Sequence, residues 1–148
     1  MPGTSSSIDI PAPPEKVWGA IADLNTYEQW MTVHVAFPDG VPEDLKEGVS
    51  FREKVTIMGM PGEVNWTVAD YQPPERIEMN GQGPMGTTLR AVFAVEAAGE
   101  GSKVSYESEF GGAALAPMQA AIEKEAHKAG EQSLEKLRGV VTGEPATA

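Results

Sequence analysis

The longest hydrophobic pattern in the chain lies near its C-terminal end, between Ala113 and Val141. Apolar or small side chains recur there at steps of three or four, a spacing that places them on one face of a helix. These positions are Leu115, Met118, Ile122, Ala126, Ala129, Ser133, Leu137 and Val141. Charged side chains lie between them, and Gly111, Gly112 and Gly143 mark the two ends. We predict one long amphipathic helix whose face, largely Ala, Met and Ser, is thin enough to lie over a cavity.

Much of the remaining chain alternates between apolar and polar side chains, which is the period of a half-buried strand. The alternation extends over Ser7–Ile10, Val49–Ile57, Val64–Val68, Ile77–Met79, Leu89–Val95 and Val104–Phe110. Short connections rich in Gly and Pro separate the last five segments, so these strands are predicted to pair in antiparallel fashion. Each strand has one apolar and one charged face, which predicts a sheet covered on one side only.

Two shorter helices are predicted between the first and second strands. Pro14 suits the first turn of a helix, where a missing N–H costs nothing. The apolar face of this helix is Val17, Trp18, Ile21 and Leu24. Asn25 or Thr26 is expected to cap a second helix that holds Tyr27 and Trp30.

The segment from Met31 to Gly48 is broken by proline and glycine, and we predict an irregular connection there. The complete order is then strand, two helices, five strands and one long helix, or β-α-α-β-β-β-β-β-α. Consecutive antiparallel strands with helices on one side define an α+β fold. We expect one domain over residues 1–148, with its ordered part at about 5–141.

The chain carries 22 acidic and 11 basic residues, which gives a net charge of −11. No segment is basic, so we expect no nucleic-acid binding. The chain has no cysteine, which excludes disulfides and thiol catalysis. No apolar run approaches the length of a membrane span, and no signal peptide is recognisable. We therefore expect a cytoplasmic protein without a membrane span, either a monomer or a weak dimer.

Several motifs resemble the START-like superfamily, also called SRPBCC or polyketide cyclase/lipid-transport-like. The resemblance covers nearly the whole chain, about residues 5–141. It rests on the long final helix and on Pro13-Pro14-Glu15-Lys16-Val17-Trp18, Asp23-Leu24 and Tyr27-Glu28-Gln29-Trp30.

A second set of motifs is similar to an actinobacterial branch of that superfamily, whose members are named as toxins of a type II toxin–antitoxin system. These motifs are Trp30-Met31-Thr32-Val33-His34, Gly59-Met60-Pro61, Val64-Asn65-Trp66-Thr67-Val68 and Tyr71-Gln72-Pro73-Pro74-Glu75. The resemblance adds an antitoxin-like protein to the partners to be considered.

The superfamily has a helix-grip fold, in which a curved antiparallel sheet wraps around the C-terminal helix and leaves a cavity for apolar ligands. The resemblance therefore implies a small apolar, aromatic or lipidic ligand in a cavity between sheet and helix. Members include lipid carriers, hormone receptors, aromatase/cyclases and ring-hydroxylase subunits, so the fold alone does not define the function.

The inward faces of the predicted elements supply the candidate lining of this cavity. We expect ligand contacts from Trp30, Met31, His34, Phe51, Glu53, Val55, Trp66, Val68, Met79, Leu89, Phe93, Tyr106, Phe110, Met118 and Ile122. Most of these side chains also suit an ordinary core, and the methionines would make the walls adaptable.

Three of these residues, Glu53, Tyr106 and His34, are candidates for acid–base chemistry. Strand alternation places Glu53 on the inward face, where burial raises the pKa of a carboxyl group and lets it act as a general acid. The alternative is a structural role for Glu53, with exposure at a bulge or strand end, or with a pairing to Arg52 or Arg90.

His34 lies in the irregular segment, where it can orient a ligand, exchange a proton or simply lie exposed. His127 falls among the charged positions of the final helix and is predicted to be solvated. The two histidines are far apart, and neither a HExxH motif nor a calcium loop is present, so we expect no metal and no cofactor.

Three functions remain as hypotheses. The first, which we favour, is the binding of a small apolar ligand without covalent chemistry. The second is a cyclase- or dehydratase-like enzyme that uses the acid–base candidates. The third is the toxin of a pair, neutralised by a partner chain.

Overall fold

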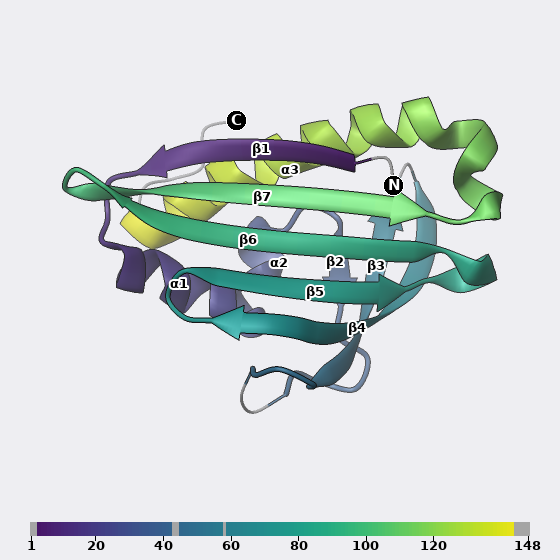
Figure 1. Cartoon of the computed structure of the whole chain (residues 1–148), viewed down its shortest axis with the longest axis horizontal. Coiled ribbons are helices and arrows are strands. Elements are labelled where there is room, and N and C mark those ends of the chain that lie inside the picture. The colour runs from purple at the N-terminus through teal and green to yellow at the C-terminus, as the bar shows by residue number, and fades with distance from the viewer. Residues whose placement is uncertain (1–2, 43–44, 58, 144–148) are drawn as a thin grey trace.

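The computed structural model describes residues 3–42, 45–57 and 59–143. They form a curled seven-stranded antiparallel sheet with helices on its concave side (Figure 1). The strand order is β1-β7-β6-β5-β4-β3-β2, so that β1 (Gly3–Ile10) and β2 (His34–Ala36) form the two edges. The predicted α+β helix-grip architecture is confirmed.

The five longer strands that follow β2 pair with their neighbours in sequence. They are β3 (Ser50–Ile57), β4 (Met60–Gln72), β5 (Arg76–Gln82), β6 (Thr88–Ala98) and β7 (Gly101–Gly111). The register sets inward-facing side chains opposite one another, as in the pairs Phe51–Trp66 and Phe93–Tyr106. A bulge in β4 near Ala69 interrupts the ladder with β5, and bulges of this kind increase the bend of a sheet.

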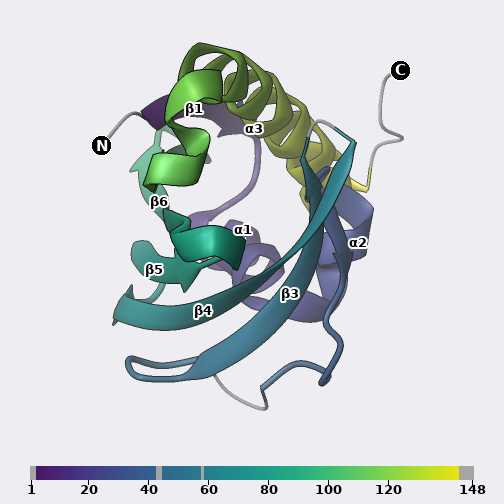
Figure 2. The ribbon, with the colours of Figure 1, turned by 90° about the vertical axis from the view of Figure 1, so that its right-hand side faces the viewer.

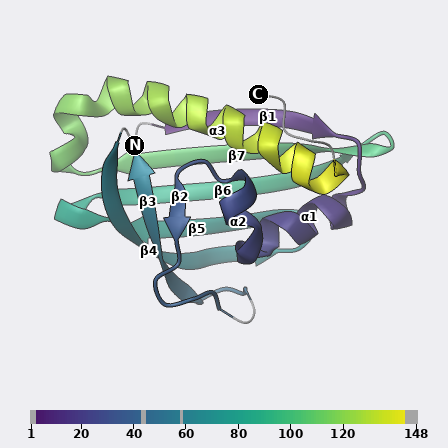
Figure 3. The same ribbon diagram turned by 180° about the vertical axis from the view of Figure 1, so that it is seen from behind.

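Three helices cover the concave side of the sheet (Figure 3). α1 (Pro14–Ala22) and the short α2 (Tyr27–Trp30) are joined by a 3₁₀ turn. The long α3 (Gln119–Thr142) runs along the β1 side of the sheet and packs mainly against β1 and α2. Figure 2 shows how the sheet curves around the space that these helices occupy. The buried residues of α3 are Ile122, Gly130, Ser133, Leu134, Leu137 and Val141.

Two element predictions need correction in the segments that flank these helices. The segment predicted to be irregular contains β2, because three residues are too few to show an alternating pattern and the strand forms through pairing with β3. The final helix begins at Gln119 and not at Ala113. Residues Ala113–Met118 form 3₁₀ turns that include Pro117, and the residue before a proline avoids the α conformation.

The first helix also ends earlier than the pattern predicts, and Leu24 belongs to the following 3₁₀ turn. Asp23 provides the cap here, since its Oδ1 accepts a hydrogen bond from the backbone N–H of Asn25 at 3.1 Å. Thr26 makes no capping bond to α2, and its hydroxyl instead donates to the carbonyl oxygen of Ala20 at 2.9 Å. The predicted cap by Asn25 or Thr26 is therefore wrong.

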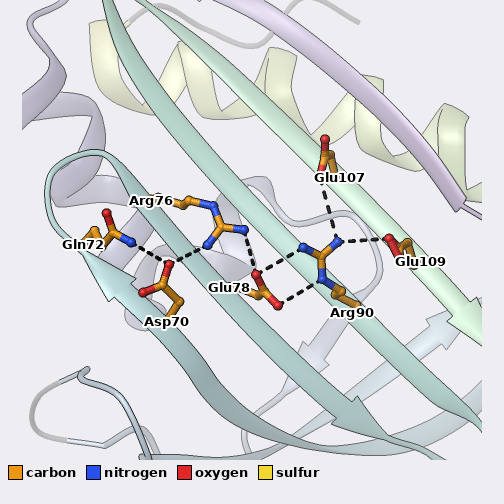
Figure 4. A network of polar contacts seen from close by, with 7 residues as sticks. All are labelled: Asp70, Gln72, Arg76, Glu78, Arg90, Glu107 and Glu109. Carbon is orange, nitrogen blue, oxygen red and sulfur yellow. Dashed lines mark hydrogen bonds and ion pairs between the residues drawn. The ribbon is translucent and has the colours of Figure 1, made fainter.

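The convex face of the sheet carries a ladder of alternating acidic and basic side chains across β4 to β7 (Figure 4). Arg76 contacts Asp70 at 2.6 Å and Glu78 at 2.7 Å. Arg90 lies on the other side of Glu78 at 3.0 Å and also reaches Glu109 at 3.0 Å. Hydrogen bonds from Arg90 and then from Arg76 hold the pKa of Glu78 below its ordinary value.

The position of Glu78 in this ladder predicts a pH-dependent contribution to stability. The pKa of Glu78 is lower in the folded chain than in the unfolded chain. Its contribution to stability is therefore fully present above the pKa that Glu78 has in the unfolded chain. It is lost as the pH falls through the pKa that Glu78 has in the folded chain. Glu78→Gln should lower the free energy of unfolding by about 1 kcal/mol at neutral pH, and by less at about pH 3. Urea denaturation at both pH values measures the difference, with Glu100→Gln in the exposed β6–β7 turn as control. A Glu78→Gln effect of equal size at both pH values would contradict the assignment.

Candidate functional site

The most unusual group on the concave face is the carboxyl group of Glu53 on β3. Glu53 is only 4% exposed, and its side chain lies inward with those of Phe51 and Val55, as the alternation predicts. The indole Nε1–H of Trp66 donates to Oε1 of Glu53 at 2.9 Å. Nδ1 of His34 lies 2.7 Å from Oε2. Both carboxyl oxygens therefore have a nitrogen partner inside the core.

These partners exclude the exposed position and the arginine pairings considered for Glu53, and leave a structural role open. Arg52 and Arg90 both lie on the convex face, where Arg52 binds Asp39 and Glu63 and Arg90 belongs to the charged ladder. A pairing of Glu53 with either arginine is therefore wrong, and so is exposure at a bulge or strand end.

His34 is the first residue of β2, and its side chain is only 5% exposed. The exposed loop position that the sequence also allowed for His34 is therefore wrong. The imidazole packs between Tyr27, at a ring distance of 6.0 Å, and Phe37, at 4.4 Å. Among the described residues Nε2 has no hydrogen-bond partner, yet it is not one of the fully enclosed polar atoms. The imidazole thus has one nitrogen bound to Glu53 and one nitrogen open.

Trp66 reaches Glu53 because the residue opposite it on β5 is Gly81. A Cβ atom on Gly81 would lie 2.8 Å from Cε3 of Trp66 and 2.7 Å from Cγ1 of Val64. Real Cβ atoms do not approach other atoms so closely, so the indole ring occupies space that only glycine leaves free.

A series of aromatic rings connects this cluster with the middle of the sheet. Tyr27 contacts Trp30 edge-on at 4.9 Å, and Trp30 meets Phe93 at 5.6 Å. Phe93 in turn stacks on Tyr106 at 4.4 Å, with ring planes 11° apart. The aromatic side chains of β6 and β7 are thereby in contact with those of α2.

Two phenol groups of this series share the surroundings of Glu53. Burial raises the pKa of Tyr27 well above its usual value, and the charges of Glu53 and Tyr106 add to the rise. Burial likewise raises the pKa of Tyr106 to about 12. Both phenols remain neutral at physiological pH and can donate hydrogen bonds. Sequence reasoning placed Tyr27 in the second helix but missed it as a site residue, because its spacing to Trp30 is also that of an ordinary core pair.

The other predicted lining residues are distributed over the same concave face. Leu89 and Tyr106 are partly buried, whereas Met118 precedes α3 and is 37% exposed. Met118 therefore lies outside the buried set. The buried members are Trp30, Met31, Phe51, Val55, Trp66, Val68, Met79, Phe93, Phe110 and Ile122.

The small residues of α3 have specific contacts. A Cβ atom on Gly130 would lie 3.3 Å from Cδ2 of Tyr106, so glycine allows the helix to approach β7 closely. Ser133 accepts a hydrogen bond from the backbone N–H of Thr32 at 3.1 Å and fixes the segment after α2. Part of the thin helix face therefore serves close packing. A cavity beneath the rest, near Ala126, stays a prediction.

Two open hollows lie beside the loop between β2 and β3. The larger has a volume of about 530 Å³ and is bordered by residues 39–42 and by polar side chains of β3 and β4, among them Arg52 and Asn65. The smaller, of about 290 Å³, lies between the end of α1 and residues Val41, Pro42 and Leu45. No residue of α3 borders either hollow.

Within residues 3–42, 45–57 and 59–143, no three histidine, aspartate or glutamate side chains gather in a way that could hold a metal ion. In the same part of the chain, the helices are too short or too polar to cross a membrane.

Comparisons to known proteins show the family and agree with the fold. Residues 1–142 match the family described as polyketide cyclase / dehydrase and lipid transport, and the chain belongs to this family. A Mycobacterium tuberculosis protein named Toxin Rv0910 is 37% identical over 115 residues, which cover 78% of this chain and 80% of that protein.

Solved structures share the fold at low sequence identity. Protein CV1439 from Chromobacterium violaceum superposes with a TM-score of 0.73 at 18% identity, covering 98% of this chain and 99% of the other. TTHA0849 from Thermus thermophilus gives a TM-score of 0.75 at 17% identity, covering 96% and 98%. At these identities the likeness shows the fold alone.

The contact between Gly81 and Trp66 predicts opposite effects for the same substitution at two glycines. Gly81→Ala should lower the free energy of unfolding by about 1–3 kcal/mol, because the new methyl group displaces the indole ring. Gly19 is exposed on α1, and a Cβ atom added there would meet no other atom within 4 Å. Gly19→Ala should therefore raise the free energy of unfolding by roughly 0.5–1 kcal/mol through helix propensity. Urea denaturation measures both values. Equal stability of Gly81→Ala and the parent protein would contradict the close contact.

Proposed function

We propose that this protein binds a small apolar or aromatic ligand on the concave side of the sheet beneath α3, without covalent chemistry. The observation that carries the proposal is the paired carboxyl group of Glu53 among aromatic side chains. Burying a charged group in a core costs several kcal/mol unless partners compensate, and apolar residues of similar volume fill a core without that cost. A polar anchor within apolar walls is the usual construction of a small-molecule site.

Family membership supports the same proposal. The family description joins cyclase and dehydrase enzymes with lipid transport, and both activities need an apolar molecule held inside the fold. The lining offers aromatic faces from Phe93 and Tyr106 together with partly buried Leu89 on β6. Flat or lipidic ligands suit such walls.

An enzyme of the cyclase or dehydratase type is the second candidate, favoured by the contact between Glu53 and His34. A histidine oriented by a carboxylate is a common general base, and the neutral phenol of Tyr106 can serve as a proton donor. Glu53→Gln separates the two candidates when a substrate is found. Binding without turnover in the variant, beside an active parent, would favour the enzyme.

The binding proposal predicts a response to a neutral apolar fluorophore such as N-phenyl-1-naphthylamine. The probe should gain fluorescence and change tryptophan emission at saturation, with one site per chain. Ala126→Phe, on the face of α3 turned toward the sheet, should weaken probe binding about tenfold or more by filling the space.

The same substitution at exposed Ala121 is the matched control and should leave binding unchanged. Thermal unfolding establishes that both variants fold. Probe binding no better than that of a compact protein of equal size and charge would contradict the proposal. So would a folded Ala126→Phe variant that binds like the parent.

A protein partner is a further candidate, because a relative that covers 78% of this chain is named as a toxin. If the chain acts in such a pair, its expression alone should arrest growth of its host. Co-expression of the product of the adjacent gene should restore growth and yield a complex on size-exclusion chromatography. Normal growth at high expression would contradict this function.

A further inference from the structure

The carboxylate of Glu53 determines which nitrogen of His34 carries the hydrogen. An indole N–H can only donate, so Oε1 of Glu53 accepts from Trp66 at 2.9 Å. With Glu53 as a carboxylate, Oε2 is an acceptor, and Nδ1 of His34 donates to it across 2.7 Å. A neutral imidazole that donates from Nδ1 has an acceptor at Nε2. In this arrangement the carboxylate selects the tautomer of His34 that accepts hydrogen bonds at its open nitrogen, and Trp66 holds the carboxylate in place.

This acceptor has no partner among the described residues, although the His34 side chain is only 5% exposed. Nε2 is open and lies beside aromatic rings, so a ligand that supplies a donor there forms a hydrogen bond that no described residue provides. Tyr27 and Phe37 pack against the imidazole, so the donor must belong to a flat and largely apolar molecule. The nearby carboxylate and the net charge of −11 disfavour an anion.

We propose that the ligand carries a neutral, weakly acidic hydroxyl group, a phenol or an enol, which donates a hydrogen bond to Nε2 of His34. This inference rests on the proposed function, since it names the class of ligand that the same site takes. Glu53 and Trp66 are positioning residues in this account, because they act on the ligand only through the imidazole.

The chemistry of Glu53→Gln provides a sharp test of this role. The glutamine side chain must still present an oxygen to the Trp66 N–H, which turns its NH₂ group toward Nδ1 of His34. Nδ1 then becomes the acceptor and Nε2 the donor. The variant should therefore prefer a ligand that accepts a hydrogen bond over one that donates.

The experiment compares 2-naphthol with 2-methoxynaphthalene, two probes of nearly equal shape of which only the first donates. Tryptophan emission or calorimetry measures both affinities at neutral pH. The parent protein should bind 2-naphthol about tenfold or more tightly than the ether. His34→Phe should abolish this preference while it still binds the ether, and Glu53→Gln should abolish or reverse it.

Equal binding of the two probes by the parent would overturn the hydroxyl assignment and leave the proposed function intact. Binding of neither probe would overturn both. If Glu53→Gln does not fold, ¹⁵N NMR of the parent decides the tautomer, with His127→Gln to assign the signals of the two histidines. The signature of an Nδ1–H imidazole at His34 is expected, and an Nε2–H imidazole would overturn the inference.

Discussion

The burial of one carboxylate on the concave face is the constraint to which much of this structure responds. Glu53 is held by two ring nitrogens, and each of these contacts depends on an unusual local feature. His34 reaches it because a strand of three residues, β2, pairs with β3 at the edge of the sheet. Trp66 reaches it because Gly81 leaves space for the indole ring. Loss of either donor would leave a buried charge with an unused acceptor.

The two faces of the sheet differ in how their charged side chains are paired. On the convex face, acids and bases alternate across four strands, and each of the pairs Arg76–Glu78 and Arg90–Glu78 is partly open to solvent. Such pairs contribute modestly to stability and keep the exposed face polar. On the concave face, the side-chain partners of Glu53 among the described residues are His34 and Trp66. The proposed function gives this carboxyl group the role of orienting a ligand.

The sequence was sufficient to predict the alternation, the inward position of Glu53 and the element order apart from the short β2, because these depend on local spacing. It was not sufficient to find the partners of Glu53. His34 and Trp66 lie 19 and 13 residues away from it, and their contacts depend on strand register and on a ring that lies over a glycine of a third strand. Tyr27 was missed for a similar reason, since its pKa is raised by burial in the folded core and further by Glu53 and Tyr106, which belong to other elements.

The thin face of α3 illustrates how one pattern can have two physical causes. Small side chains at a helical spacing indicate either a cavity or a close approach of the backbone. At Gly130 and Ser133 the cause is close approach, to Tyr106 and Thr32. In the N-terminal half of α3 this face combines buried Ile122 with partly buried Ala126 and Ala129, and the proposed ligand position lies beside them.

A crystal structure of the protein with 2-naphthol tests this central claim most directly. The account predicts the naphthalene ring between α3 and the sheet, with its oxygen within hydrogen-bond distance of Nε2 of His34. A fully occupied ring in the outer hollow beside Arg52, or a ring beneath α3 whose oxygen points away from His34, would contradict it.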